Sequence, residues 1–363
     1  MNLRPFYLER WQQNPCKYDL GSAGMVKLRL RDLITEIDYD MELGYGATSG
    51  SSLIREEVAD LFENVEKNNV LITSGTEEAN FLAVYRLLKR GDDLVTVLPT
   101  FMQCINLARS LGAKVKSCRL LEREGYRLDL ERFRELITKK TKIIYLANPN
   151  NPTGSIISGK EMQAICEMAE DVNAWILCDG ALRGLEVDGE AASSPVENYE
   201  RGIASGSLSK IGLSGIRIGW LVADEKLVKE CWAYKDYTTL SHSGIGEYLA
   251  TIALRKENMQ KYIERAKKII IAHRAILSNW VLENRQTLSW IPPKAGHTAF
   301  VKYNLNINSQ DLCKQLLEED GVLIEAGDYF GSPKHLRIRY SCEKEVLTEA
   351  LKRFSAFLRR RQN

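Results

Sequence analysis

The sequence predicts an α/β protein: a large domain with a mainly parallel sheet and helices on both faces, then a smaller α+β C-terminal domain. Two observations predict this fold class. From about residue 70, short apolar runs alternate with amphipathic stretches, which is typical of right-handed βαβ units. After about residue 255, one long helical pattern leads into mixed strands and helices. We expect an N-terminal segment at 1–30 that packs with the small domain, a large domain at 31–255 and a small domain at 256–363.

Each element follows from its local pattern. Large-domain strands are predicted at the apolar runs Val70–Thr73, Leu94–Leu98, Lys114–Leu120, Ile143–Ala147, Ala174–Cys178, Ile203–Ser205 and Trp220–Ala223. Helices are predicted between most of them, at Glu77–Lys89, Met102–Leu111, Leu130–Ile137 and Gly159–Asp171. The small domain is predicted to hold helices at Asn258–Asn284, Ser309–Glu319 and Glu343–Arg359 and strands at Ala299–Tyr303, Val322–Ile324 and Leu336–Tyr340. The basic end at Arg359–Arg361 is expected to be a frayed helix end.

The composition excludes several classes of protein. Apolar content of 44% and charged content of 27% are those of a soluble globular chain, and no apolar run approaches the roughly 20 residues of a membrane span. A net charge of +2 gives no reason to expect nucleic acid as a partner. Eight scattered cysteines without a CxxC pair predict a reduced, cytoplasmic protein, and four isolated histidines give no reason to expect a metal.

The most informative segment surrounds Lys210. Glycine, serine and apolar residues flank this lysine, with Ser207 three residues before it and Arg217 seven after. Such surroundings desolvate the amine, lower its pKa and make it a nucleophile towards an aldehyde. A hydroxyl and a guanidinium are groups that bind phosphate. An aldehyde and a phosphate on one small molecule describe pyridoxal 5'-phosphate (PLP). The alternative is a glycine-rich loop with a chance lysine.

Other polar motifs follow the predicted strands, and ligands of open α/β sheets bind at that edge. The triplet Ser74-Gly75-Thr76 opens a helix, where backbone N–H groups and hydroxyls favour a phosphate. Asp179 ends an apolar run and could pair with the pyridine nitrogen of PLP. Asn151 could donate to its phenolic oxygen, and Phe101 could stack on its ring. The alternatives are ordinary helix capping for the triplet, a capping aspartate, an Asn-Pro turn and a core aromatic.

The order and spacing of these motifs resemble the class I/II aminotransferase family of fold type I PLP enzymes over essentially the whole chain. The motifs that carry this resemblance are Tyr45-Gly46-Ala47-Thr48-Ser49-Gly50 with Leu53 and Arg55, Ser74-Gly75-Thr76, Pro99-Thr100-Phe101, Asn151-Pro152-Thr153-Gly154, Ser207-Leu208-Ser209-Lys210 with Arg217, and Leu336-Arg337-Ile338. The resemblance implies the aminotransferase-like PLP fold, PLP as cofactor, and amino acid and 2-oxo acid substrates.

The resemblance also implies roles for single residues. Lys210 would form the Schiff base and move the proton, and Asp179 would hold the pyridinium. The other cofactor-binding residues would be Ser74, Gly75, Thr76, Phe101, Asn151, Ser207 and Arg217. Tyr45 would reach the phosphate in a neighbouring subunit, which implies a homodimer with shared active sites. Arg337 would clamp the substrate α-carboxylate beside the Gly21–Gly24 segment. The alternative for Arg337 is an exposed edge-strand arginine, which also fits Arg339.

The sequence departs from the family pattern at two points. Asp179-Gly180-Ala181-Leu182 stands where the family usually has Asp-Glu-x-Tyr, so a tyrosine hydroxyl that donates to the phenolic oxygen is missing. The gap between Lys210 and Arg217 is one residue shorter than usual. The first departure changes how the cofactor is held.

The sequence and its resemblance to this family lead to three alternative functions. The first is an aminotransferase that converts an L-amino acid into a 2-oxo acid through a quinonoid intermediate. The second diverts that intermediate into elimination, cyclisation or O2-dependent oxidation of a cationic amino acid such as arginine. The Phe6–Trp11 segment favours it, because this segment resembles the N-termini of capreomycidine synthases and PLP-dependent arginine oxidases. The third is a non-enzymatic PLP-binding module. The sequence does not specify the substrate side chain, the amino acceptor or the pathway.

The resemblance to arginine-processing enzymes implies that Glu9 binds a cationic substrate side chain. The alternative is a solvated Glu9 paired with Arg4 or Arg10. Asp236 is a second candidate for the same role.

Overall fold

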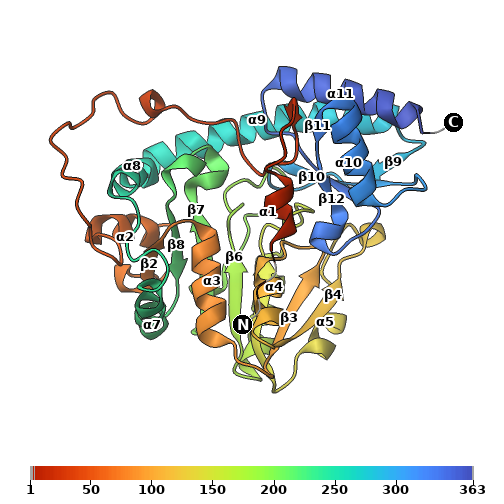
Figure 1. Cartoon of the computed structure of the whole chain (residues 1–363). Helices are drawn as coiled ribbons and strands as arrows, with labels where there is room; N and C mark the ends of the chain where they lie inside the picture. Colours follow the sequence, from red (N-terminus) through yellow and green to blue (C-terminus); the bar gives the residue numbers. More distant parts are fainter. Residues whose placement is uncertain (1–2, 4, 362–363) are drawn as a thin grey trace.

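The computed structural model describes residue 3 and residues 5–361, and its largest sheet has seven strands in the order β2-β8-β7-β6-β5-β3-β4 (Figure 1). Strand β8 runs antiparallel to its neighbours β2 and β7, whereas the pairs from β7 to β4 are parallel. The strands are β2 Val70–Thr73, β3 Asp93–Leu98, β4 Lys114–Arg119, β5 Thr141–Ala147, β6 Trp175–Asp179, β7 Gly202–Ser207 and β8 Gly219–Val222. The prediction of a mainly parallel sheet is confirmed, and its seven strands lie within two residues of their predicted bounds.

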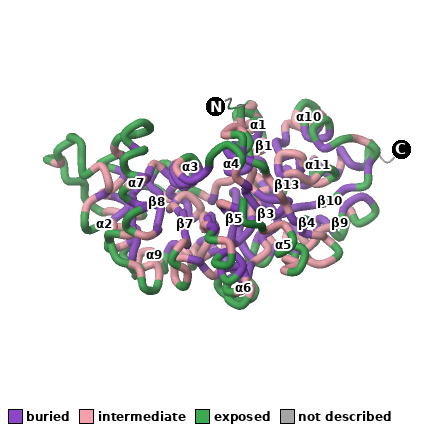
Figure 2. Tube along the Cα trace, turned by 90° about the horizontal axis from the view of Figure 1, so that it is seen from below, coloured by how far each residue is buried: buried purple, intermediate pink, exposed green. Residues whose placement is uncertain are grey.

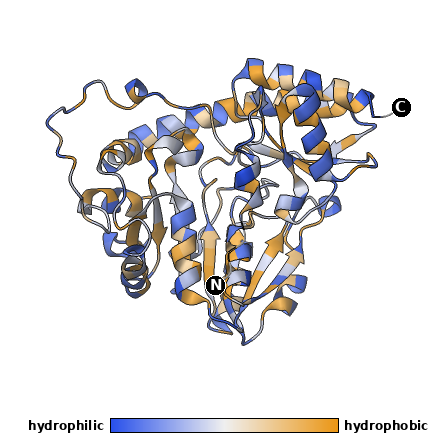
Figure 3. Cartoon of the chain, viewed as in Figure 1, coloured by the Kyte–Doolittle hydropathy of each residue, from blue (hydrophilic) through white to orange (hydrophobic). Residues whose placement is uncertain are grey.

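Helices cover both faces of this sheet, because successive side chains along each strand point to opposite sides. Leu94 and Leu177 pack with the helices α3 Thr76–Leu87, α4 Gln103–Ser110 and α7 Glu225–Lys235. On the opposite face, Val95 and Ile176 pack with α5 Leu130–Leu136 and α6 Gly159–Glu170. Figure 2 shows the strands as the buried centre, and Figure 3 shows hydrophilic positions on the outer sides of the helices.

The helix α9 (Lys256–Glu283) extends from the large sheet to a second, antiparallel sheet of four strands in the order β12-β13-β10-β9 (Figure 1). The strands of the second sheet are β9 Leu288–Trp290, β10 Thr298–Tyr303, β12 Glu325–Ala326 and β13 His335–Arg339. The helices α10 Ser309–Asp320 and α11 Lys344–Arg359 complete this smaller α+β domain. The predicted fold class is therefore confirmed.

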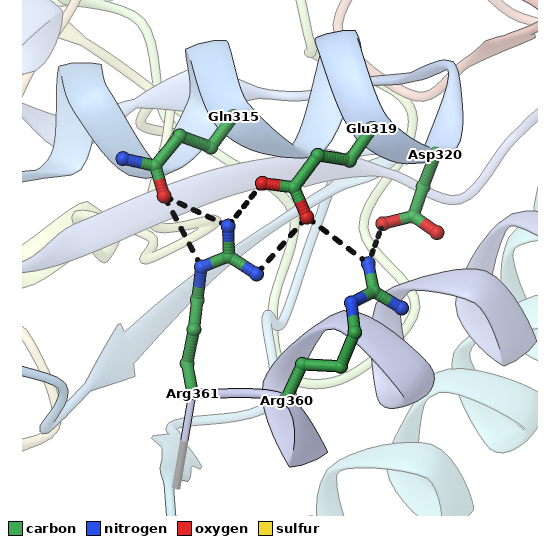
Figure 4. Close-up of polar contacts among 5 residues, drawn as sticks. All are labelled: Gln315, Glu319, Asp320, Arg360 and Arg361. Atoms are coloured by element: carbon green, nitrogen blue, oxygen red, sulfur yellow. Dashed lines mark hydrogen bonds and ion pairs between the residues drawn. The ribbon is translucent and has the colours of Figure 1, made fainter. Parts of the chain in front are cut away.

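The basic C-terminal end is not frayed, contrary to the sequence-based expectation. Arg361 donates to Gln315 Oε1 (2.8 Å) on α10 and forms an ion pair with Glu319 (Figure 4). Arg360 forms ion pairs with Glu319 and Asp320 at the end of the same helix. The sequence of α11 alone could not show that Gln315, Glu319 and Asp320 of α10 would lie beside these arginines.

The N-terminal segment contacts the small domain. The short strand β1 (Tyr18–Asp19) pairs in parallel with β11 (Val322–Leu323), and Trp11 Nε1 donates to the carbonyl of Ile324 (2.7 Å). One strand was predicted at 322–324, but the chain divides there between β11, which pairs with β1, and β12, which joins the four-stranded sheet.

Four helices and the strands β1 and β9 were not predicted. The helices are α1 Tyr7–Trp11, α2 Ser52–Ala59, α7 Glu225–Lys235 and α8 Gly244–Leu254. Side chains cap three of these helices: Ser51 accepts from the backbone N–H of Ile54 in α2, Asp224 from Lys226 and Leu227 in α7, and Ser243 from Gly246 in α8. In the described part of the chain, no helix is both long and apolar enough to cross a membrane.

Candidate active site

A cavity of about 1060 Å³ lies at the carboxyl ends of the parallel strands, between the N-terminal segment and the small domain. Most of the residues predicted to carry chemistry line it: Glu9, Thr76, Phe101, Asn151, Asp179, Ser207, Lys210, Arg217 and Arg337. They come from separate parts of the chain and are brought together because parallel strands end at one edge of a sheet. Ser74, Gly75 and Gly21 do not line the cavity but contact residues that do: Ser74 and Gly75 contact Arg217, and Gly21 contacts Arg337.

Lys210 lies on the short 3-10 helix Leu208–Ile211, whose preceding residue, Ser207, accepts a hydrogen bond from Ser209 N–H. Its Nζ donates to the carbonyl of Ala23 (2.7 Å) in the N-terminal segment. Burial lowers the pKa of Lys210, and the nearby Arg337 guanidinium lowers it further. A lower pKa increases the share of neutral amine, which is the nucleophilic form.

Asp179 ends β6 and is 7% exposed. Its carboxylate accepts from the Ala181 N–H (3.0 Å) and from Asn80 Nδ2 (2.9 Å), and Asn80 in turn accepts from Ser205 Oγ (2.6 Å). Burial raises the pKa of Asp179, whereas these hydrogen bonds act in the opposite direction. A carboxylate that is fixed on two sides and faces a cavity is suited to pair with a cationic ring nitrogen.

The start of α3 forms a cup for an anion. Gly75 has φ +103°, and a Cβ at this position would lie 2.7 Å from Arg217 Nη2, so only glycine lets the guanidinium approach the helix terminus. Arg217 Nη2 donates to the Ser74 carbonyl (2.9 Å). Thr76 Oγ1 is buried and has no partner among the described residues. The Ser74 N–H donates to Glu78 Oε2 (2.6 Å), which fixes the turn that precedes the helix.

Arg337 lies in β13 between two neighbouring strands and is 1% exposed, so it is not an exposed edge-strand residue. Its guanidinium donates to Asn151 Oδ1 (3.2 Å) and to the Gly21 carbonyl (2.8 Å), and it forms an ion pair with Glu325 at 2.6 Å. Burial raises the pKa of Glu325 to about 8, although the cation lowers it. Arg339, the alternative on the same strand face, pairs with Asp19 at 3.2 Å and also lines the cavity.

Glu9 lies half-buried on α1 and lines the cavity near Lys210, Arg337 and Glu77. Of the two arginines considered as its partners, Arg4 lies outside the described residues, and no ion pair joins Glu9 to Arg10 in the described part of the chain. Asp236 is exposed at the end of α7 and does not line this cavity.

The remaining predicted residues differ in their placement. The ring of Phe101 lies 5.3 Å from that of Phe6 between ring centres, at the cavity wall. Leu182, which replaces the tyrosine of the family pattern, also lines the cavity and packs beside Gly296. Tyr45 is 85% exposed and does not reach the cavity of its own chain.

Sequence reasoning missed four residues of this site: Asn80, Glu78, Glu325 and His297. Asn80 has a detectable signal, because it is a polar residue on the buried side of an amphipathic helix. Glu325 and His297 follow short apolar or glycine-containing stretches, and only the pairing of β12, β13 and β10 places them beside Arg337.

The aminotransferase class I and II family model matches residues 13–354, and the chain belongs to this family. The chain is therefore a PLP-dependent transferase. A PLP-dependent aminotransferase from Streptococcus suis has 34% identity and a TM-score of 0.92, with 99% of each chain covered. The PLP-dependent cyclase OrfR has 26% identity and a TM-score of 0.91, covering 99% of this chain and 98% of its own. Capreomycidine synthase from Streptomyces vinaceus is 29% identical over 84% of this chain and 78% of its own length.

The cavity fits the cofactor of this family. Its donors include a buried threonine hydroxyl without a partner (Thr76), a guanidinium held against a glycine at a helix terminus (Arg217 and Gly75), and an amine (Lys210). Asp179 supplies an anion on the same wall. This set matches a molecule that carries a phosphate, an aldehyde and a basic ring nitrogen.

Proposed function

We propose that the protein transfers the amino group of an L-amino acid to a 2-oxo acid, with Lys210 as the residue that moves the substrate's α-proton. The observation that carries this proposal is the half-buried Lys210 amine, which lies near both Asp179 and Arg337 in one cavity. PLP supplies an electron sink when it is bound. Asp179 and Asn151 would hold its ring, and Ser74, Gly75, Thr76, Ser207 and Arg217 its phosphate.

The protein's own groups perform the remaining steps. Arg337 orients the substrate through its carboxylate, so that the Cα–H bond faces Lys210. Lys210, as a neutral amine, accepts the proton from Cα, and the resulting ammonium group returns a proton later in the cycle. Asp179 stays ionised next to a cationic ring nitrogen, because each charge stabilises the other where water is excluded.

The proposal is tested by mixing the PLP-loaded protein with single L-amino acids and measuring 2-oxo acid formation. We expect one equivalent per active site without an acceptor and continuous turnover after a 2-oxo acid is added. Lys210→Ala keeps the phosphate cup, so it should still bind PLP while losing deuterium exchange at Cα in D2O, followed by NMR. Exchange at the wild-type rate in this variant would refute the role of Lys210.

A second candidate function is elimination, cyclisation or O2-dependent oxidation of a cationic amino acid such as arginine. Glu9 favours it, because this carboxylate lies in the cavity close to Lys210 and is not paired with Arg10 in the described part of the chain. Leu182 favours it too, since one hydrogen-bond donor to the cofactor is missing. Two of the relatives are named capreomycidine synthase and PLP-dependent cyclase. Oxygen uptake or a cyclic product would select this candidate over transamination.

Glu9→Gln tests the substrate class separately. We expect wild type to prefer arginine, ornithine and lysine to alanine and aspartate, and the variant to lose about tenfold or more in kcat/KM for the cationic substrates only. Glu343→Gln, which removes an exposed carboxylate at the rim of the same cavity, is the matched control. A wild-type enzyme without this preference would exclude the role of Glu9.

The proposal includes a homodimer in the cytoplasm. Tyr45 lies on a long exposed segment together with Tyr39 and Leu43, which are 90% and 79% exposed, and exposed apolar groups of this kind favour a protein interface. Seven of the eight free cysteines are buried, which fits a reducing compartment.

A further inference from the structure

His297 is a buried imidazole that the reaction described above does not use. It precedes β10, is 1% exposed and lines the cavity. Neither Nδ1 nor Nε2 makes a hydrogen bond of normal geometry in the described part of the chain; the Ala23 carbonyl lies near the ring but already accepts from Lys210 Nζ. A buried polar group without a partner costs free energy, so an unpaired side chain on a cavity wall indicates that a ligand completes its hydrogen bonds.

The surroundings of His297 keep the ring uncharged. Burial lowers the pKa of His297 far below its ordinary value, and Lys210, Arg337 and Arg339 lower it further. The backbone of Ala23 acts in the opposite direction but is the weakest of these influences. A neutral imidazole has one N–H donor and one acceptor nitrogen, so it can bind a ligand without adding a charge.

Arg337 alone offers an incomplete site for a carboxylate. Its Nη2 already serves both the Gly21 carbonyl and the carboxylate of Glu325, and its Nη1 donates to Asn151. One Nη1 hydrogen and the buried Nε–H remain, and Glu325 already offsets the positive charge when it is ionised. These two hydrogens belong to different nitrogens of a guanidinium that is already engaged on both Nη atoms, so a carboxylate with two oxygens gains from another donor close to Arg337. Arg339 Nε and the His297 ring are the unpaired groups on this wall, and His297 is the one that adds no further charge.

We infer that His297 is a second substrate-binding residue, whose neutral imidazole donates a hydrogen bond to the substrate's α-carboxylate beside Arg337. This inference rests on the proposed function, because it assumes an amino acid with its carboxylate at Arg337. The ring's other nitrogen remains an acceptor towards the neighbouring cations.

Two pairs of probes isolate the carboxylate: L-arginine with agmatine, and L-alanine with ethylamine. The second member of each pair keeps the amine but has no carboxylate. Apparent Kd values for the PLP-loaded protein are measured from the change in its visible spectrum. A hydrogen bond to a charged group contributes about 1.5–3 kcal/mol, so His297→Phe should raise the Kd of both amino acids by about tenfold or more and leave both amines nearly unchanged. His297→Asn or His297→Gln should restore part of the affinity.

Equal effects on acids and amines, or no effect on either, would refute the role of His297 while leaving the proposed function intact. A wild-type protein whose spectrum responds to none of the probes would refute the proposed function as well. Because His297→Phe could fail to fold, the wild-type protein is also examined by NMR with ¹⁵N-labelled histidine, of which the chain has four. One imidazole should shift with L-arginine but not with agmatine, and identical shifts with both would overturn the inference.

Discussion

At the scale of single residues, the cavity combines groups whose charges depend on one another. Arg337 and Glu325 form an ion pair in which neither side chain is more than 1% exposed. Removing two charges from water costs more than their attraction returns unless other partners satisfy them. Arg337 has such partners in Asn151 and Gly21, whereas burial raises the pKa of Glu325 even though Arg337 and the Gln12 side chain both favour its ionised form. The partners of Glu325 therefore do not fully offset the cost of burying its negative charge.

Comparing wild type with Glu325→Gln should show the cost of burying this carboxylate as a pH-dependent difference in the free energy of unfolding. The folded pKa of about 8 lies above the ordinary value of 4.5. Between these pH values the folded protein holds a proton that the unfolded chain releases, so the contribution of Glu325 to stability falls as pH rises towards 8. Relative to Glu325→Gln, wild type should lose on the order of 1 kcal/mol per pH unit between pH 5 and 8, measured by urea unfolding.

Glu349→Gln is the control for this experiment, because Glu349 is a partly exposed glutamate of α11 outside the cavity. A stability difference between wild type and Glu325→Gln that stays constant from pH 5 to 8 would mean that the buried pair is ionised throughout.

At the scale of elements, the ends of strands and the beginnings of helices determine where the groups of the site lie. The strand β2 ends at Thr73, and α3 begins three residues later at Thr76. The turn between them needs a backbone conformation that glycine adopts readily, and the same glycine makes room for Arg217. The anion cup therefore depends on one short connection between a strand and a helix.

Gly75→Ala should weaken PLP binding by about tenfold or more, because the new methyl group would displace the Arg217 guanidinium, a charge-assisted phosphate donor. The left-handed backbone should also cost about 1–3 kcal/mol of stability. Gly91→Ala is the matched control: Gly91 has φ +94°, and a Cβ there would meet no atom within 4 Å.

PLP affinity is measured by titrating the apoprotein, and stability by thermal unfolding. Both variants should lose stability, and only Gly75→Ala should lose PLP affinity. Equal PLP affinities in the two variants would contradict the arrangement of the cup.

At the scale of the whole molecule, the exposed segment with Tyr39, Leu43 and Tyr45 lies on a long loop that extends outward beyond α2 and α8 (Figure 1). We predict a dimer with twice the mass of the 41.2 kDa chain in sedimentation experiments. Leu43→Asp should shift it towards the monomer, because a charge at an apolar interface is costly to desolvate. It should also weaken PLP binding if Tyr45 reaches a neighbouring site.

Leu282→Asp is the control for the dimer, since Leu282 is an exposed leucine (59%) on α9. A monomeric wild-type protein, or a Leu282→Asp variant that dissociates as readily as Leu43→Asp, would argue against an interface at this segment.

The sequence predicted the large sheet well because its strands are continuous apolar runs, a pattern typical of strands buried on both faces. It also placed Lys210, Asp179 and Asn151 at one edge, since parallel strands end together. The N-terminal strand β1 was missed because two residues give no periodic pattern and only β11 defines it. His297 was treated as an isolated histidine, because its neighbours come from other elements.

The pairing of the N-terminal segment with β11 also has a consequence for the order of events during synthesis. Trp11 bonds to Ile324, 313 positions further along the chain. The cavity wall includes both Glu9 and Arg337, so the first helix has to wait for the last strand to leave the ribosome. Contacts so distant in sequence form slowly, because a long loop has to close before they add stability. A nascent chain therefore cannot complete this cavity until the residues of β13 have been translated.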